Sequence, residues 1–471
     1  MIRIPAIAAA LVAATASAVC VAQSTRTPSV RWPGYTPNMF RWDEDYRFLR
    51  DQPGLALFPY RLKYIALSED GARYASLGGE YRFRVDEYQR PDFGLHNAAD
   101  FASVQQRFLL HADVHFNSAV RLFVQLGGAA ENGRKPFARP PDRSGADLAQ
   151  GFLEIASTPD TARWRVRVGR QEVALGRYVA IRDGTNIRRT FDGVRLDGAI
   201  DDWALTGVAA RATRNLRPAF DDDPDPNDGV YLLMAEHPLP WTGYKAGVIV
   251  IERNNYLARY AAGVGVERRR SVGVRLFGGN RGWDADGQVS YQFGSFAPAG
   301  QVLLDIDAWG AAFEGGRSFG TPWKPRLALR VDVAGGDNRP HDKRLTTFDL
   351  PYPNLSYLTD AALFSPRNVH DVQPFVSITP ARDLTFTAGA QFLWRNSRYD
   401  AVYSAAYFPV VPPGGRGLYV TTEPYARLNW RMMPLAEFQG GVVRAMPGEA
   451  LRSFGGTRRL DFAFASFALR F

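Results

Sequence analysis

A two-residue hydrophobic period recurs along most of the chain and restricts its possible folds more than any other feature. Between Val104 and Phe116, one set of alternate positions is mainly Val, Phe, Leu and Ala, and the other set carries Gln, Arg, His and Asp. Successive side chains of a β-strand point to opposite faces, so such a strand has one apolar and one polar face. The same alternation appears at 76–86, 326–333 and 384–395. These segments predict an all-β protein.

About 18 segments share this pattern, which suits a closed sheet wide enough to enclose water. After the N-terminal apolar run, no stretch approaches the roughly 20 continuous apolar residues of a membrane helix. In lipid, only helices and closed barrels satisfy every backbone polar group. We therefore expect a transmembrane antiparallel β-barrel with short periplasmic turns and long extracellular loops. The expected strands are 73–88, 103–117, 119–130, 148–157, 163–174, 191–200, 202–214, 229–236, 244–253, 267–278, 283–294, 301–315, 325–335, 368–379, 384–395, 423–431, 435–445 and 458–471.

The connections between these segments support the barrel, because long and short connections mostly alternate, as they do in outer-membrane barrels. The connection at 295–300 breaks the alternation, since it should be long and is brief. The long connections are expected at 90–101, 131–147, 175–190, 215–228, 254–266, 336–367 and 396–422. The short ones are expected at 117–118, 158–161, 201, 380–383 and 432–434.

The N-terminus has the form of a secretory signal, with a basic start at Arg3, an apolar run over 6–21 and small residues before a cleavage point after Ala22. Cys20 is the only cysteine, so a mature chain cleaved at this point has no disulfide and no thiolate metal site. The expected division is a signal peptide at 1–22, a periplasmic or lumenal lead-in at 23–72 and an outer-membrane barrel at 73–471.

The last strand ends on Phe471, which shares its face with Phe467 and Leu469. A terminal aromatic on an amphipathic last strand is typical of the assembly signal of bacterial outer-membrane barrels, although a last strand that merely ends in Phe would read the same. The expected partners are therefore the barrel assembly machinery, outer-membrane lipid and lipopolysaccharide.

The formal net charge is +9, with a sequence pI of about 9.6, and arginine supplies most of the positive charge. A basic total of this kind indicates nucleic acid, an acidic surface or an acidic solute as partner. An exported chain is not expected to meet nucleic acid, so an anionic solute or polysaccharide is the favoured partner.

Arginine is suited to such a solute, because its guanidinium stays charged and binds a carboxylate through two parallel hydrogen bonds. Rings of arginine also set anion preference in pores. The alternative is that arginine–carboxylate ladders stiffen the barrel interior without touching solute. Strand parity points these arginines inward: Arg82, Arg84, Arg107, Arg121, Arg165, Arg167, Arg330 and Arg427. The carboxylates expected to balance them are Glu80, Asp86, Asp113, Glu172, Asp192 and Asp332.

The stretch 168–196, which contains VGRQE, GR and RDGTNIRRTFDGVRL, resembles the alginate export family of outer-membrane proteins. The segments 63–67, 76–82 and 106–113 resemble the same family. The resemblance implies an 18-stranded barrel that exports an acidic polysaccharide through a cationic constriction. The turn at 432–434 is too short for the pore-plugging periplasmic turn that the resemblance also implies. The resemblance adds Arg170, Arg188, Arg189 and Arg195 to the candidate substrate pathway.

Two groups of residues suggest metal ligands, but a non-metal interpretation is favoured for both. His111, Asp113 and His115 share one strand face and are expected to line the lumen. The run 221–229 partly resembles a calcium loop, although its glycine falls one position late and prolines interrupt it; a solvated external loop is expected. We expect no metal, no cofactor and no catalytic residue, since no Gly-x-Ser-x-Gly, His-Glu-x-x-His or P-loop motif is present.

The expected function is an outer-membrane channel for passive export or diffusion of anionic solutes, with an acidic polysaccharide such as alginate as one candidate. A general or small-substrate porin is the alternative within the same architecture. A surface adhesin or a barrel enzyme is the alternative from another class.

Overall fold

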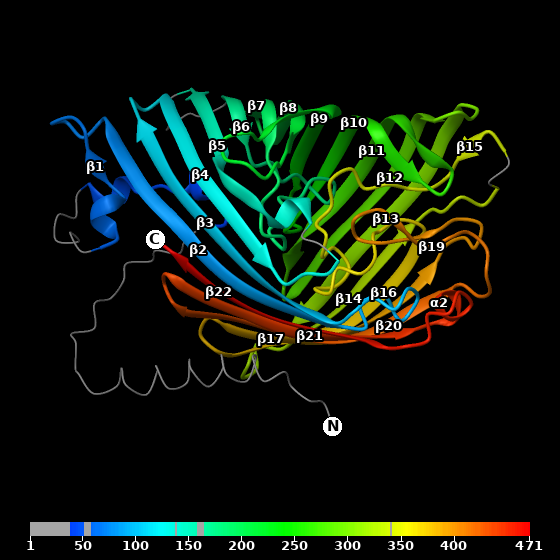
Figure 1. Ribbon diagram of the computed structural model, residues 1–471. Helices are drawn as coiled ribbons and strands as arrows, with labels where there is room; N and C mark the ends of the chain where they lie inside the picture. The colour runs from blue at the N-terminus through cyan, green and yellow to red at the C-terminus, as the bar shows by residue number, and fades with distance from the viewer. Residues whose placement is uncertain (1–37, 51–57, 137–138, 158–163, 340–341) are drawn as a thin grey trace.

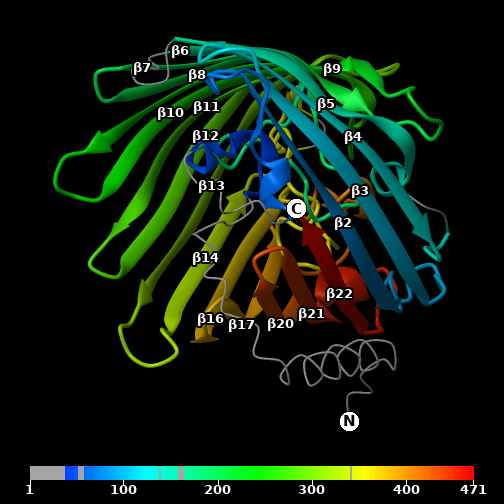
Figure 2. The ribbon, with the colours of Figure 1, turned by 90° about the vertical axis from the view of Figure 1, so that its left-hand side faces the viewer.

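The chain forms a closed β-barrel in the computed structural model, which describes residues 38–50, 58–136, 139–157, 164–339 and 342–471. Within those residues, 18 antiparallel strands pair in succession, and β2 pairs with β22 to close the barrel (Figure 1). Figure 2 shows these strands arching around an interior that holds several connecting segments. The predicted fold class is confirmed. The barrel strands are β2 (Tyr74–Gln89), β3 (Phe101–His115), β4 (Val120–Asn132), β5 (Ser144–Ala156), β6 (Trp164–Gln171), β7 (Phe191–Ile200), β8 (Trp203–Arg214), β9 (Asp223–Leu239), β10 (Tyr244–Tyr260), β11 (Gly263–Asn280), β12 (Trp283–Pro298), β13 (Leu304–Ser318), β14 (Arg326–Ala334), β16 (Val369–Ala381), β17 (Leu384–Arg395), β20 (Tyr419–Met433), β21 (Ala436–Pro447) and β22 (Leu460–Arg470).

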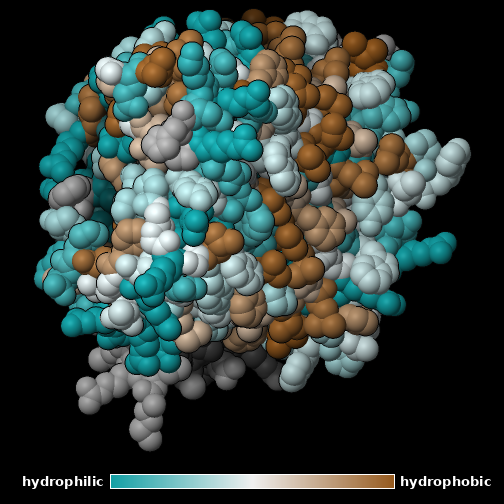
Figure 3. Space-filling view, turned by 90° about the vertical axis from the view of Figure 1, so that its right-hand side faces the viewer, coloured by the Kyte–Doolittle hydropathy of each residue, from teal (hydrophilic) through white to brown (hydrophobic). Residues whose placement is uncertain are grey.

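The barrel wall follows the two-residue period of the sequence. On β3, Phe108 is 63% exposed on the outer face, whereas its neighbour Arg107 is 2% exposed on the inner face. On β11, exposed Val272 and Val274 alternate with inward-facing Arg269 and Ser271 in the same way. Figure 3 shows apolar side chains gathered on part of the outer surface. Apolar side chains outside and polar side chains inside are the arrangement that a barrel in lipid requires.

The lengths of the connections show which end of the barrel is periplasmic and which is extracellular. Short turns such as 201–202, 281–282 and 382–383 lie at the end where β2 begins. Long connections such as 335–368 and 396–418 lie at the other end. Because outer-membrane barrels carry short periplasmic turns and long external loops, the end with the long connections is extracellular. The short turn expected at 158–161 lies outside the described residues.

Two expected connections are wrong. The segment 254–266 does not form a long loop, because β10 and β11 continue as a hairpin joined only at 261–262. The run 221–229 is not a loop throughout, because β9 begins at Asp223. In both places the regular two-residue alternation is interrupted in the sequence. A β-bulge shifts the register between Asn255 and Ala258 of β10, and β9 begins with a run of Asp and Pro, so backbone pairing extends the strands where the period does not predict them. The brief connection near 295–300 is present at 299–303.

Two extracellular connections fold back into the barrel and meet there. Segment 172–190 follows β6, and segment 335–368 follows β14. Tyr352 accepts a hydrogen bond from the Ala180 amide at 2.9 Å and donates its own amide to the Tyr178 carbonyl at 3.0 Å. Tyr178 and Tyr352 are both buried in one apolar cluster with strand residues. The lumen is therefore narrowed by packed chain. The short elements in the connections are η5 (Pro140–Asp142), β15 (Arg344–Leu345), β18 (Val402–Tyr403), β19 (Pro409–Val411) and α2 (Glu449–Arg452).

The segment before the barrel lies at its periplasmic end. Trp42 packs on Phe123 and Phe152 of the inner wall, and the Arg41 guanidinium donates to the Phe471 carbonyl at 2.7 Å. The expected signal peptide at 1–22 and the start of the lead-in lie outside the described residues. In the part that the structure describes, no helix is long and apolar enough to span a membrane. The elements before the barrel are η1 (Arg41–Asp43), η2 (Arg47–Leu49), η4 (Tyr60–Leu62) and β1 (Ile65–Ala66), which pairs with β2.

Candidate functional site: an arginine-lined lumen

A cavity of about 190 Å³ lies in the lumen, between the strand wall and the inward-folded connections. Inner residues of β2, β20, β21 and β22 form one side of it, and segments 183–185 and 354–362 form the other. Five arginines and four carboxylates line this cavity, so positive charge is in slight excess. They are Arg82, Arg84, Arg139, Arg427 and Arg470, with Asp86, Asp183, Asp360 and Glu437.

Strand parity correctly predicted the inward positions of Arg82, Arg84 and Arg427 but did not find all the arginines of this cavity. The predicted inward set omits Arg470, although Arg470 shares the inward face of β22 with Ser466. Arg139 lies in the connection before β5, where no strand period extends. The missed Arg470 could have been found from the same parity, whereas Arg139 carried no sequence signal.

Arg82 differs from most arginines of the lumen in its partners. Its guanidinium donates to the carbonyls of Asp183 at 2.7 Å and Thr185 at 2.6 Å, and to the Asn186 side chain at 3.3 Å. Among the residues that the structure describes, no carboxylate lies within ion-pair distance of it. Arg84 by contrast donates to Asp86 at 2.6 Å, and Arg427 contacts Asp360 at 3.2 Å. The positive charge of Arg82 is therefore shared with neutral acceptors only.

A buried ion-pair network anchors segment 172–190 to the inner wall. Glu80 accepts from the Arg107 Nε at 2.8 Å and from the Arg470 Nε at 2.7 Å. Asp183 accepts from Arg107 at 2.9 Å and from Arg188 at 2.7 Å. Burial would raise the pKa of the Asp183 carboxyl, but the nearby Arg188 and Arg107 guanidinium groups hold it well below its usual range. The Asp183 carboxylate is therefore charged, and the network fixes the position of the inward connection.

Other charged residues of segment 172–190, which carries part of the family resemblance, also lie inside the barrel. Arg188 lies 3.5 Å from Glu172, which is itself buried. Arg189 donates to the carbonyls of Ala180 and Pro353, at 3.3 Å and 3.2 Å, and so links the two inward connections. Arg188 and Arg189 therefore hold the two inward-folded connections in place where they narrow the lumen.

A second group of arginines lies toward the periplasmic end of the lumen. Arg121, Arg165 and Arg167 converge on Glu154, with nitrogen–oxygen distances of 2.8, 3.7 and 2.6 Å. The Arg167 guanidinium also stacks over the ring of Trp42 at 3.9 Å. Three cations therefore share Glu154 at the mouth where the lead-in segment sits, and one of them, Arg121, also contacts Asp113 at 3.1 Å.

Other predicted pathway residues are paired outside the arginine-lined cavity. Arg170 and Asp192 pair across β6 and β7 at 2.9 Å, and Arg195 pairs with Asp197 at 2.8 Å. The Arg330 guanidinium donates to Asp332 at 2.7 Å, and the same carboxylate accepts from the Tyr357 hydroxyl at 2.6 Å. These contacts fit the alternative reading, in which arginine–carboxylate pairs stiffen the wall.

Neither candidate metal group of the sequence is assembled. The His111 ring stacks on Phe123, whereas Asp113 contacts Arg121 at 3.1 Å. Asp223 starts β9 and pairs with Arg214 at 2.7 Å, so the run 221–229 does not fold as the calcium loop that it partly resembles. The described residues instead bring together one group of three carboxylates: Asp147, Asp221 and Asp222.

A closed barrel with an apolar outer face and a polar, arginine-rich interior defines an outer-membrane channel of the porin-like class. The chain belongs to the alginate export family, whose description is alginate export and whose profile matches residues 73–465.

Solved structures agree on the fold. The chain is similar to the outer membrane protein OpdK of Pseudomonas aeruginosa, with a TM-score of 0.52 and 10% identity, over 84% of this chain and 98% of that one. It is similar to OccK2 (OpdF) of the same organism, in complex with glucuronate, with a TM-score of 0.53 and 14% identity, over 87% and 98%. None of the curated proteins compared with the chain matches it.

Proposed function

We propose that the protein is a passive outer-membrane channel for carboxylate-bearing solutes, with an acidic polysaccharide such as alginate as the leading substrate class. The observation that carries the proposal is the lumenal cavity with five arginines and four carboxylates. Arginine does not lose its proton at physiological pH and presents a planar fork that fits a carboxylate. A fixed cation at the constriction therefore lowers the barrier for an anion that enters the lumen.

The mixed charge of the cavity favours passage of an anion and disfavours its tight binding. An anion must bind well enough to enter and weakly enough to leave. Arg82 donates only to neutral acceptors, while Arg427 and Arg84 are each balanced by a carboxylate. Arg82 is buried, so its charge attracts a solute carboxylate without contacting it, whereas the more exposed Arg427 can contact the solute while it stays near Asp360. This arrangement favours brief binding.

The chemistry of the similar proteins is compatible with this proposal. OccK2 (OpdF) was crystallised with glucuronate and OpdK with vanillate, and both ligands carry a carboxylate. The family description names alginate, which is a polyuronate. Neither the fold nor the family fixes the solute of this chain, so the substrate class rests on the arginines.

A small-substrate porin is the second candidate, and the size of the cavity favours it. A volume of about 190 Å³ is below the roughly 300–1,000 Å³ of pockets that hold drug-sized ligands. In the structure, the inward connections 172–190 and 335–368 leave room for a small acidic solute. Passage of a polymer would require these connections to separate.

Blockage of ion current distinguishes the two candidates. With the purified protein in a planar bilayer, an oligouronate is expected to interrupt the KCl current, and a neutral oligosaccharide of equal length is not. A monouronate that blocks while the oligomer has no effect would favour the small-substrate porin. Equal responses to charged and neutral sugars would contradict the proposed role of the arginines.

A further inference from the structure

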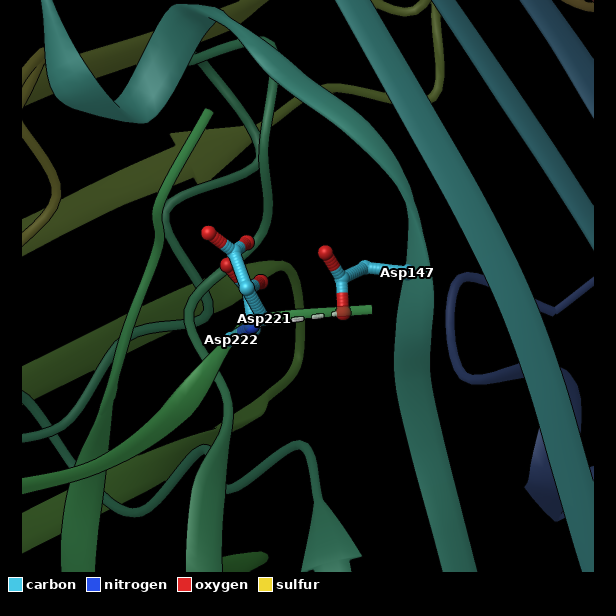
Figure 4. A group of neighbouring side chains, drawn as sticks. All are labelled: Asp147, Asp221 and Asp222. Carbon is cyan, nitrogen blue, oxygen red and sulfur yellow. Dashed lines mark hydrogen bonds between the residues drawn. The ribbon is translucent and has the colours of Figure 1, made fainter. Parts of the chain in front are cut away.

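Three carboxylates from distant parts of the sequence meet at the extracellular end of the barrel. Asp147 belongs to β5, while Asp221 and Asp222 end the connection 215–222 between β8 and β9. One oxygen from each side chain lies within 4.8 Å of the other two. Figure 4 shows the Asp147 carboxylate turned toward the connection that carries the other two residues.

The Asp147 side chain is buried, and none of the described residues gives it a cationic partner. It is 5% exposed, and its Oδ2 atom has no hydrogen-bond donor in the described part of the chain. Its Oδ1 atom accepts from the Asp222 amide, at the long distance of 3.4 Å. The Oδ1 atom of Asp221 is likewise buried, with no donor among the residues that the structure describes. Buried carboxylate oxygens without partners are costly, and such oxygens are normally satisfied by a donor or by a cation.

The nearest cation does not neutralise the cluster. Arg170 donates its Nη2 to the Asp222 carbonyl at 3.0 Å, but its Nε is paired with Asp192 at 2.9 Å. The Asp222 carboxylate accepts from the Leu216 amide at 2.7 Å and from the Asn215 side chain at 2.9 Å, both of which are neutral donors. The cluster therefore holds more negative charge than its surroundings compensate.

We propose that Asp147, Asp221 and Asp222 bind a calcium ion. The three ligands are hard oxygen donors, which suit calcium or magnesium and not zinc. Calcium binds oxygen at about 2.3–2.6 Å, so a single ion can contact oxygens that lie up to about 4.8 Å apart. Magnesium, with bonds of about 2.0–2.1 Å and a strict octahedron, keeps several water ligands and usually takes only one or two protein carboxylates, so a cluster of three suits calcium better.

The local backbone already holds the site together. The Gly145 amide donates to the Arg217 carbonyl at 3.0 Å, and the Phe220 amide donates to the Ala146 carbonyl at 3.0 Å. A Cβ atom at Gly145 would lie about 3.0 Å from the backbone of residues 218 and 219, so the connection 215–222 packs closely against β5. A cavity of about 40 Å³ lined by Asp147 and Asp222 adjoins the site and offers room for the water ligands that complete the shell.

The ion would serve the channel in two ways. It would pin the connection 215–222 to β5 over the ends of β6 and β7. It would also add positive charge beside a cavity that Arg107, Glu172 and Arg188 line on its other side. The extracellular part of the constriction thus depends on calcium for both order and charge.

Isothermal titration calorimetry of the full chain in detergent, treated with EDTA and then titrated with CaCl2, tests this site. One calcium per chain is expected, with a Kd of about 10⁻⁴–10⁻³ M, as in extracellular calcium modules. Asp147→Asn is expected to weaken binding at least about tenfold, because it removes one charged ligand. Asp225→Asn is the matched control, since its carboxylate contacts the Asn227 amide outside the cluster, and it should bind as the wild type does.

Measuring heat stability with and without calcium tests the site even if a substitution affects folding. Without calcium, Asp147→Asn should be at least as heat-stable as the wild type, because it removes an unpaired buried charge; with calcium, only the wild type should gain stability. Asp221→Asn provides a second variant at a less buried position. Wild-type binding no tighter than that of either variant would overturn the site, and a response to MgCl2 alone would overturn calcium as its ion. Neither result bears on ion selectivity, which tests the proposed function separately.

Discussion

Replacing Glu80 with glutamine is expected to lower the free energy of unfolding of the barrel by about 3–5 kcal/mol. Glu80 is buried and accepts hydrogen bonds from Arg107 and Arg470, while Arg188 lies 3.6 Å away. Glutamine keeps the shape but removes the charge, so these guanidinium groups lose an anion that they share in a region of low dielectric constant. Removing one member of a buried ion pair leaves an uncompensated buried charge, which is the source of the large cost.

The measurement is urea unfolding of the protein in detergent, followed by the change in electrophoretic mobility between the folded and unfolded barrel. Asp284→Asn is the matched control, because Asp284 is 42% exposed in its pair with Arg326, and solvated pairs contribute at most about 1 kcal/mol. The double variant Glu80→Met with Arg107→Met should recover most of the loss, since an apolar pair can replace a buried ion pair. A Glu80→Gln effect no larger than that of the control would show that the network does not hold the inward connection.

Charge reversal at two solvated lumenal arginines is expected to lower the anion preference of the pore at least about fivefold. Arg427, whose side chain is 37% exposed, lines the central cavity, and Arg165, at 36%, faces the periplasmic mouth. A unit charge about 4 Å from a mobile ion changes its energy by about 1 kcal/mol even in water, and this corresponds to about a fivefold change in partition. Arg165→Glu combined with Arg427→Glu reverses both charges along the path.

The reversal potential of the double variant in a planar bilayer measures this effect. Arg382→Glu is the control, because its side chain is 97% exposed on a periplasmic turn, away from the lumen. Arg107 and Arg167 are unsuited to the same test, since each is almost fully buried against a carboxylate and its loss would disturb the wall. Unchanged selectivity in the double variant would mean that ions do not pass these residues.

The sequence period predicted the barrel wall closely, and its errors have a physical pattern. The bounds of β7 and β17 are the same as predicted, because these strands lie within lipid and need one apolar face. Strands β9, β10 and β11 are longer than predicted, because β9 begins with Asp and Pro, a bulge interrupts β10 and the start of β11 is rich in Gly. The period therefore reveals the regular part of a strand and misses the irregular ends that backbone pairing adds.

The site was only partly predictable for a similar reason. Parity indicates that Arg82 and Arg427 point inward, but it cannot show which inward-facing arginines will meet a carboxylate. That outcome depends on the path of the connections, which bring Asp183 and Asp360 to the wall from distant parts of the sequence. The acidic run at 221–229 partly resembles a calcium loop, but the carboxylate that joins Asp221 and Asp222 in space is Asp147, on another strand.

The reversal potential of the unmodified protein across a planar bilayer, under a KCl gradient, tests most directly whether guanidinium groups govern a water-filled lumen. Five arginines against four carboxylates in the central cavity predict a potential of the sign that marks chloride as the more permeant ion. A potential of the opposite sign, with potassium favoured, would contradict the account.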